Sequence, residues 1–151
     1  MPTTSKAKLT LEDYLPYRLS ILSNLVSGMI AHAYQDKFAL TVNEWRIMAV
    51  LGEYPGSSAD DIVKKTQTEK SIISRALQRL LKRRLVKRQV STTDRRRQHL
   101  TLTKVGRDIY SQVVPLSYDY EKSLLDCFTK QEKDNFSKLI DKLHTHAEQI
   151  R

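Results

Sequence analysis

The chain has 151 residues, 40% of them hydrophobic and 28% charged, with a net charge of +9, as expected of a single globular domain over residues 1–151. No apolar run approaches the ~20 residues of a membrane helix, and no apolar stretch follows the N-terminal lysines, so we expect neither a membrane protein nor a secretory signal. Cys127 is the only cysteine, which excludes an internal disulfide and a cysteine-rich metal site, and we expect a cytoplasmic protein without cofactor or metal.

Apolar residues at helical spacing predict four helices in the first two thirds of the chain, over 11–34, 41–52, 59–65 and 69–83. Residues that cap helices precede the last three of these: Thr41 with Glu44 as a capping box, Ser57 or Ser58, and Thr68.

The pattern then changes from helical spacing to alternation. Residues 85–90 and 99–102 alternate apolar and polar side chains around the polar stretch 91–97, which predicts a β-hairpin with a basic tip. Thr103 is expected to cap a long helix toward Leu125, kinked at Pro115. A last helix is predicted over about 131–150. The predicted fold is mainly α with a small β-wing.

The positive charge of the chain is concentrated in one segment. Residues 69–98 hold 11 basic and two acidic residues, and the rest of the chain holds 15 of each sign. A solvated charged face usually mixes both signs, whereas a patch of one sign on an otherwise balanced protein is typical of a protein that binds a polyanion.

Two short helices joined by a tight turn and followed by a basic hairpin predict a winged helix-turn-helix. An α-helix fits the major groove of DNA, so the exposed side of the helix over 69–83 should carry hydrogen-bonding and cationic side chains, as it does. The hairpin tip can reach a neighbouring minor groove, whose narrow stretches attract arginine. Phosphate contacts, which give affinity without reading sequence, are expected from Arg79, Lys82, Arg83, Lys87 and Arg88.

Five sequence motifs resemble the MarR family of transcription regulators, and they keep the family's order and spacing over roughly 11–150. They are 40–46 (LTVNEWR), 74–80 (SRALQRL), 85–88 (LVKR), 94–96 (DRR) and 102–106 (LTKVG). The resemblance implies a homodimer that binds a pseudo-palindromic operator in double-stranded DNA. The DNA-binding lobe would span about 41–102, and long N- and C-terminal helices, about 9–36 and 103–150, would intertwine with the partner.

The resemblance also implies roles for single residues. In the wing, Arg96 would enter the minor groove while Asp94 braces the loop. Where the family commonly has glycine after the recognition helix, this chain has Arg84, which costs on the order of 1 kcal/mol if that position needs a positive φ. The expected DNA contacts are Ser57, Thr68, Lys70, Ser71, Ser74, Arg75, Gln78, Arg79, Arg84, Arg88, Asp94, Arg95, Arg96 and Arg97.

Two further stretches, 13–20 (DYLPYRLS) and 44–46 (EWR), resemble a subgroup that senses hydroxycinnamates, related aromatic acids or their coenzyme A thioesters. In this subgroup the effector lies in a cleft between the dimerisation helices and the DNA-binding lobe. The effector contacts expected here are Tyr17, Ser27, His32, Arg46 and Tyr110.

Each of these residues also has a structural interpretation. Arg46 is either a carboxylate clamp or the partner of Glu44, Asp36 or another acid, and His32 either donates to a ligand or is a satisfied helix residue. The tyrosines suit a dimer interface equally well.

The sequence lacks a glycine-rich phosphate loop and the common hydrolase motifs, so we expect no catalytic residues and no enzyme. The favoured function is a repressor released from its operator by a small aromatic or amphipathic carboxylate or its coenzyme A thioester. The alternative is a weakly specific architectural DNA-binding protein without an effector.

Overall fold

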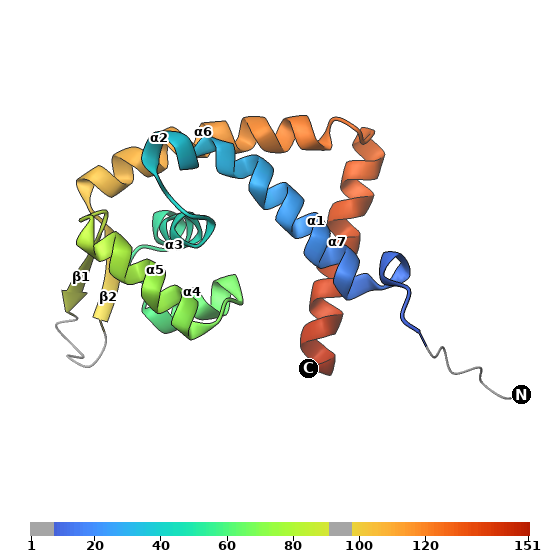
Figure 1. Ribbon diagram of the computed structural model, residues 1–151, viewed down its shortest axis with the longest axis horizontal. Helices are drawn as coiled ribbons and strands as arrows, with labels where there is room; N and C mark the ends of the chain where they lie inside the picture. Colours follow the sequence, from blue (N-terminus) through green and yellow to red (C-terminus); the bar gives the residue numbers. More distant parts are fainter. Residues whose placement is uncertain (1–7, 91–97) are drawn as a thin grey trace, which may run out of the picture.

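The computed structural model describes residues 8–90 and 98–151 and shows a mainly helical chain with one two-stranded antiparallel sheet (Figure 1). Its elements in chain order are η1 (Leu11–Asp13), α1 (Leu15–Ile30), η2 (Ala31–Ala33), α2 (Gln35–Phe38), α3 (Val42–Glu53), α4 (Ala59–Thr66), α5 (Lys70–Lys82), β1 (Val86–Val90), β2 (Gln98–Leu102), α6 (Lys104–Leu125) and α7 (Lys130–Ile150). The predicted fold class, mainly α with a small β-wing, is confirmed. Among the described helices none is long and apolar enough to cross a membrane.

The predicted N-terminal helix over 11–34 is wrong as one continuous element. A 3₁₀ turn precedes α1, which starts one residue ahead of Pro16 because proline has no N–H to donate and fits only the first turn. A second 3₁₀ turn ends α1, and Tyr34 leaves helical geometry with φ −141°. This bend places Ala31, Ala33 and Tyr34 in the core, where each is at least 97% buried.

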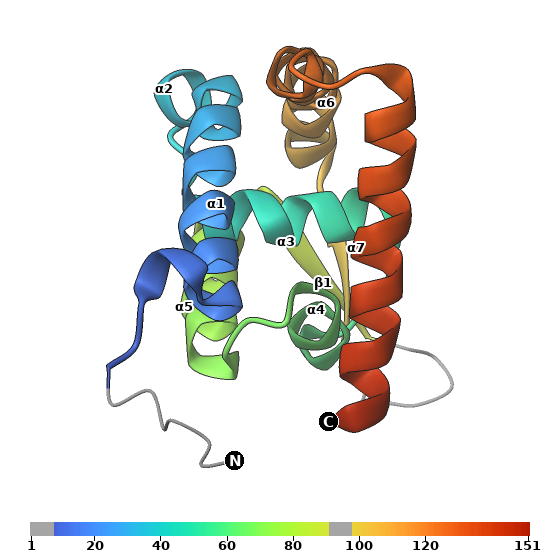
Figure 2. The same cartoon turned by 90° about the vertical axis from the view of Figure 1, so that its right-hand side faces the viewer.

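The core lies beneath the long helices, where α3, α5 and the hairpin meet. Its buried side chains include Ile47, Met48, Leu51, Ile73, Leu80, Val86 and Leu100. In Figure 1, α6 runs along the top from the wing, and α7 descends from its far end. Figure 2 shows α1 and α7 standing on different sides of the molecule. Neither α1 nor α7 has a buried residue, so the two helices contribute little to this core.

The wing is joined to both neighbouring parts of the chain. β1 pairs with β2 from Val86 opposite Leu102 to Val90 opposite Gln98, and Ser57 forms a further bridge to Leu100. As predicted, Thr103 caps α6 by accepting a hydrogen bond from the N–H of Gly106. α6 continues as one helix through Pro115.

Gly106 is required by a close backbone approach. A Cβ at this position would overlap the carbonyl oxygen of Leu85, the residue that precedes β1. The same carbonyl accepts a hydrogen bond from the N–H of Thr103 at 3.0 Å. The first turn of α6 therefore lies directly against the backbone at the start of β1, and no side chain fits between them.

Arg84, which follows the C-cap of α5, has the left-handed conformation with φ +58°. The position where the family commonly has glycine therefore does have a positive φ in this chain. The N–H of Arg84 donates to the carbonyl of Leu81, and the N–H of Leu85 donates to the carbonyl of Leu80, both at 3.0 Å. These two bonds form a Schellman motif, which glycine favours because a Cβ is strained at positive φ. The Arg84 carbonyl also accepts the Thr103 hydroxyl at 2.7 Å.

Replacing this residue with glycine should stabilise the protein. We expect Arg84→Gly to raise the free energy of unfolding by about 1 kcal/mol, because the strain of a left-handed residue exceeds the entropy that glycine loses on folding. Urea denaturation at fixed protein concentration measures this change. The control Gln78→Gly, at an exposed position in the interior of α5, should lower it by about 1 kcal/mol. A destabilised Arg84→Gly would contradict the strain.

Candidate nucleic-acid interface

Helix α5 has one apolar face and one polar face. Ile73, Ala76, Leu77 and Leu80 are buried against the core, as the helical spacing predicts. The opposite face is exposed to solvent and consists of Lys70, Ser71, Ser74, Arg75, Gln78 and Lys82. A helix fixed by its apolar face and presenting hydroxyl, amide and cationic groups on the other has the chemistry that reads base edges in a major groove.

The start of α5 differs from the prediction. Glu69, not Thr68, is the N-cap residue, and no side chain caps the helix. The hydroxyl of Thr68 donates instead to the Thr66 carbonyl at 3.2 Å. The N-terminal N–H groups of α5 thus receive no side-chain cap, and such groups attract phosphate oxygens.

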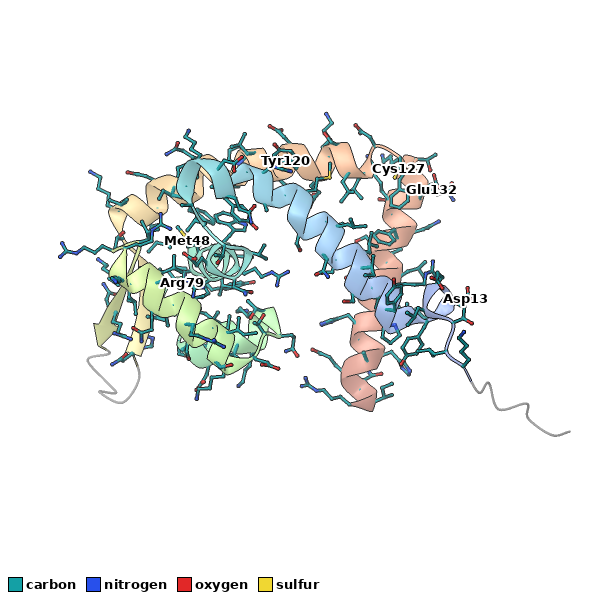
Figure 3. All side chains as sticks on the ribbon, in the orientation of Figure 1. Asp13, Met48, Arg79, Tyr120, Cys127 and Glu132 are labelled. Carbon is teal, nitrogen blue, oxygen red and sulfur yellow. The ribbon has the colours of Figure 1, made fainter. Side chains whose placement is uncertain are left out.

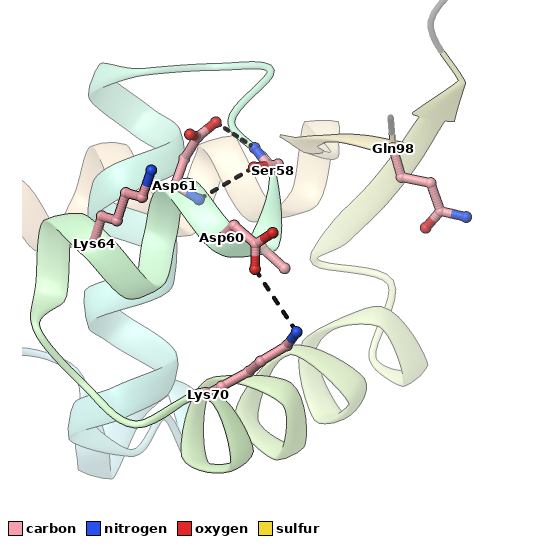
Figure 4. Close-up of a pocket in the computed structure, with 7 residues that line it drawn as sticks. Ser58, Asp60, Asp61, Lys64, Lys70 and Gln98 are labelled. Atoms are coloured by element: carbon pink, nitrogen blue, oxygen red, sulfur yellow. Dashed lines mark hydrogen bonds and ion pairs between the residues drawn. The ribbon is translucent and has the colours of Figure 1, made fainter. Parts of the chain in front are cut away.

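Lys70 lies at the same end of α5 and faces α4 (Figure 4). Its Nζ atom is 3.9 Å from the carboxylate of Asp60, and both side chains are 77% exposed. An ion pair this exposed contributes little free energy, so Lys70 remains available to DNA.

The two serines before α4 have different roles. Ser58 is the cap: its hydroxyl accepts from the N–H of Asp61, and the Asp61 carboxylate accepts from the N–H of Ser58 (Figure 4). Ser57, an expected DNA contact, is 92% buried, and its hydroxyl donates to the Tyr54 carbonyl at 2.7 Å. The Ser57 hydroxyl is therefore used inside the protein, where it fixes the turn that pairs with the wing.

Glu44 on α3 is a buried carboxylate that sequence analysis assigned to a helix cap or to an ion pair with Arg46. Its cationic partners are instead Arg79 and Arg83. It is 3% exposed and accepts hydrogen bonds from the Thr41 hydroxyl at 3.0 Å and from Nε of Arg79 at 3.3 Å. Nη1 of Arg83 lies 3.7 Å from its second oxygen. A buried carboxylate needs such partners, because an unpaired charge away from water is very unfavourable.

Arg79 and Arg83 were both expected to contact phosphates, and the structure separates them. The Arg79 side chain is 50% exposed and lies along α5 with only Nε engaged by Glu44 (Figure 3). Arg83 donates from both terminal nitrogens to backbone carbonyls, Nη1 to Ala39 at 3.1 Å and Nη2 to Phe38 at 2.7 Å. Arg79 retains free donors for DNA, whereas Arg83 is turned toward the protein.

The described part of the wing carries exposed cations on β1 and at its entry. Lys87 and Arg88 are exposed on β1, and Arg84 is exposed at the turn before it. On β2, Nδ1 of His99 is 2.7 Å from the Gly56 carbonyl and joins the wing to the turn before α4. Asp94, Arg95, Arg96 and Arg97, the expected minor-groove residues, lie outside the described residues.

The expected effector residues are not gathered around one cavity. Arg46 on α3 donates from Nη2 to the Ser27 hydroxyl on α1 at 3.3 Å, and both are partly buried. Burial raises the pKa of the neighbouring Tyr34, and the Arg46 guanidinium partly offsets this rise. His32 is exposed, with its ring 6.3 Å from that of Tyr120. Tyr17 lies apart, in a shallow apolar groove along α1.

A groove of about 300 Å³ between α1, α3 and α6 includes only Tyr110 of that set. Its lining residues are Ile30, Trp45, Ala49, Glu53, Tyr110, Val114, Ser117, Tyr118 and Glu121. Trp45 stacks between Tyr34 and Tyr110, with ring centroids 5.6 and 5.8 Å apart. Sequence reasoning missed most of this lining, because the residues come from three helices whose packing no local pattern reveals.

Three comparisons place this geometry among known proteins. A family model described as "MarR family" matches residues 40–97, which run from the start of α3 through α4, α5 and β1. A solved MarR/EmrR-family transcriptional regulator from Acinetobacter sp. ADP1 superposes with a TM-score of 0.84 at 26% identity, over 93% of this chain and 99% of that one. The chain is similar to MarR-family transcriptional regulators over these residues and shares their winged-helix fold.

Two more proteins that resemble this chain are informative. The transcriptional regulator HosA of Escherichia coli is 23% identical over 104 residues, which are 69% of this chain and 77% of HosA. BpsR of Bordetella bronchiseptica, whose DNA binding is regulated by 6-hydroxynicotinic acid, shares the fold with a TM-score of 0.78 at 20% identity, over 91% and 98% of the two chains. The predictions of a DNA-binding transcriptional regulator and of a non-enzyme are confirmed.

Proposed function

We propose that this protein is a MarR-family repressor that binds a pseudo-palindromic operator as a homodimer, and that a small aromatic ligand releases it. The exposed face of α5 carries the proposal, because its polar and cationic side chains project from a helix whose opposite face is fixed in the core. Two such helices in a dimer would enter successive major grooves about 34 Å apart.

Some residues of this face would contact base edges, and others would contact phosphates. Ser71, Ser74, Arg75 and Gln78 lie along the middle of α5, where base edges would be in reach, and Arg75 already directs Nε back to the Ser71 carbonyl at 3.3 Å. Lys70 and Lys82 at the helix ends, together with Lys87 and Arg88 on β1, would meet phosphates. We extend the same proposal to the wing arginines of 95–97.

Arg75 gives the direct test of base reading. If its guanidinium contacts a base edge, Arg75→Ala should reduce the preference for operator over scrambled DNA by about 1–3 kcal/mol. Fluorescence anisotropy at fixed salt measures both affinities. The control Lys87→Ala, a proposed phosphate contact, should weaken both duplexes equally. An unchanged preference in Arg75→Ala would assign base reading to other residues.

Dimerisation is proposed to use the long helices. α7 has no buried residue, although it carries several large apolar side chains. These are 39–71% exposed: Phe136, Leu139, Ile140, Leu143 and Ile150. Leu15, Leu19, Leu22 and Leu25 are similarly exposed on α1. Two amphipathic helices that leave so much apolar surface uncovered are expected to bury it against another chain. We therefore propose 9–36 and 103–150 as dimerisation segments and 41–102 as the DNA-binding lobe.

A charge placed on this apolar surface should weaken the dimer. Leu139→Lys should raise the dimer dissociation constant by about tenfold or more, because burying a leucine contributes roughly 1.5–3 kcal/mol. Sedimentation velocity over a range of concentrations measures this constant. Ser137→Lys adds the same charge at an exposed polar position of α7 and should leave the dimer intact. Equal effects of the two variants would exclude α7 from the interface.

For the effector we propose an aromatic or amphipathic carboxylate or its coenzyme A thioester. Two observations support this class: Arg46 is a partly buried cation held by Ser27 close to Tyr34, and the relative BpsR responds to an aromatic acid. Because the Trp45–Tyr110 groove carries the carboxylates of Glu53 and Glu121, the acid group would have to point to Arg46 and the ring to the groove.

The effector is tested by adding p-coumarate or its coenzyme A thioester to the preformed operator complex. We expect one of them to release the DNA, and Arg46→Gln to raise the concentration needed by about tenfold or more, since a charge-assisted hydrogen bond is worth ~1.5–3 kcal/mol. Arg107→Gln, an exposed arginine of α6, is the control. Release that is insensitive to Arg46→Gln would leave Arg46 as a structural residue.

The architectural alternative makes opposite predictions for the wild-type protein. A weakly specific binder would prefer no duplex, would lose affinity steeply with salt on every sequence, and would ignore both compounds.

A further inference from the structure

Two neighbouring cations at the end of α5 differ in their surroundings. Lys82 is the last residue of the helix and is exposed, with its side chain on the face proposed to meet DNA. Arg83 is the C-cap, and its guanidinium donates to the carbonyls of Phe38 and Ala39 at 2.7 and 3.1 Å. A planar guanidinium can hold two carbonyls at once in this way, and an ammonium group cannot do so with the same geometry.

The two carbonyls belong to the passage between the long helices and α3. Phe38 is the last residue of α2, a helix of four residues, and Ala39 follows it in the left-handed conformation with φ +52°. Carbonyls at a helix C-terminus lack partners within the helix and carry partial negative charge, so a cation stabilises them. Arg83 therefore supplies, from 44 and 45 residues further along the chain, the hydrogen bonds that this helix end needs.

Glu44 holds the same guanidinium from a third side. Its buried carboxylate lies 3.7 Å from Nη1 of Arg83 and 3.3 Å from Nε of Arg79, one turn earlier on α5. The Arg83 side chain is 38% exposed, so the contacts that it makes are partly shielded from water. α5 is thus tied through Arg83 both to α3 and to the segment that leads back to α1.

We propose that Arg83 is a positioning residue, which fixes the DNA-reading helix relative to the long helices and is not itself a phosphate contact. The inference rests on the proposed function, because a dimer binds a palindromic site tightly only when its two reading helices are held at the spacing of successive major grooves. Non-specific binding through phosphates needs no such spacing. Arg83 would therefore determine specificity, while Lys82 contributes affinity on every sequence.

The test compares Arg83→Ala with Lys82→Ala on two duplexes. A tight-binding duplex is first selected from a random pool with the wild-type protein, and a scrambled version serves as the second. Affinities are measured by anisotropy at several salt concentrations. We expect Arg83→Ala to bind the selected duplex about tenfold or more weakly, with unchanged affinity for the scrambled one and an unchanged salt slope. Lys82→Ala should weaken both duplexes equally and reduce the slope by about 1.

Other results would overturn the inference. If Arg83→Ala behaves like Lys82→Ala, Arg83 is a phosphate contact, and if neither affinity changes, Arg83 has no role in binding. Partial unfolding would lower both affinities by one factor, which circular dichroism would detect. If the wild-type protein selects no duplex, the proposed function fails. Hydrogen exchange measured without DNA then tests separately whether Arg83 holds the 35–41 segment in place. The backbone amides of 35–41 should exchange faster than in the wild-type protein in Arg83→Ala but not in Lys82→Ala. Equal exchange rates in Arg83→Ala and the wild-type protein would refute the role of Arg83 in holding this segment.

Discussion

The carboxylate of Glu44 is the charge around which α3 and α5 are arranged. It is 97% buried on α3, so its negative charge must be matched by cations, and the cations come from α5. Apolar contacts alone would leave α5 some freedom to rotate or slide, because hydrophobic burial has no direction. Hydrogen bonds to a fixed carboxylate do have direction, and they make one orientation of the polar face more favourable than its neighbours.

A second constraint is the left-handed backbone conformation, which one residue adopts at each of three helix ends. Ala39, Gln67 and Arg84 end α2, α4 and α5 at φ values between +50° and +58°, and none of them is glycine. Each end turns the chain sharply, so that short helices can be stacked within a small lobe. Hydrogen bonds hold two of these residues in the strained conformation: the Ala39 carbonyl accepts from Arg83, and the Arg84 carbonyl accepts from the Thr103 hydroxyl.

Local patterns predicted most of the fold. The caps Thr41, Ser58 and Thr103 were recognisable because a capping residue and its helix are neighbours in sequence, and the hairpin followed from alternation. The bend at 31–34 was missed because it contains neither proline nor glycine, and tertiary burial of Tyr34 accompanies it. Thr68 was predicted as a cap because its residue type suits that role, yet Glu69 occupies the position.

The candidate site was predictable as a surface but not as a set of contacts. A run of cations in the sequence shows no difference between Arg79, Lys82 and Arg83. The partners of Arg79 and Arg83 lie on α3 and at the end of α2, 35 to 45 residues away along the chain. The groove between α1, α3 and α6 was hidden for the same reason, since Trp45 and Tyr110 meet only after α3 and α6 have packed.

The separation of charge along the chain has a consequence for how the protein approaches DNA. All of the excess positive charge lies in 69–98, which includes α5 and β1 at one end of the molecule in Figure 1, whereas α7 lies at the other end. Such a molecule has a large electric dipole. Within a Debye length of the double helix, about 8–10 Å at ordinary ionic strength, the field would turn the protein before contact. Encounters would then begin with α5 already facing the duplex, and a larger fraction of them would lead to binding.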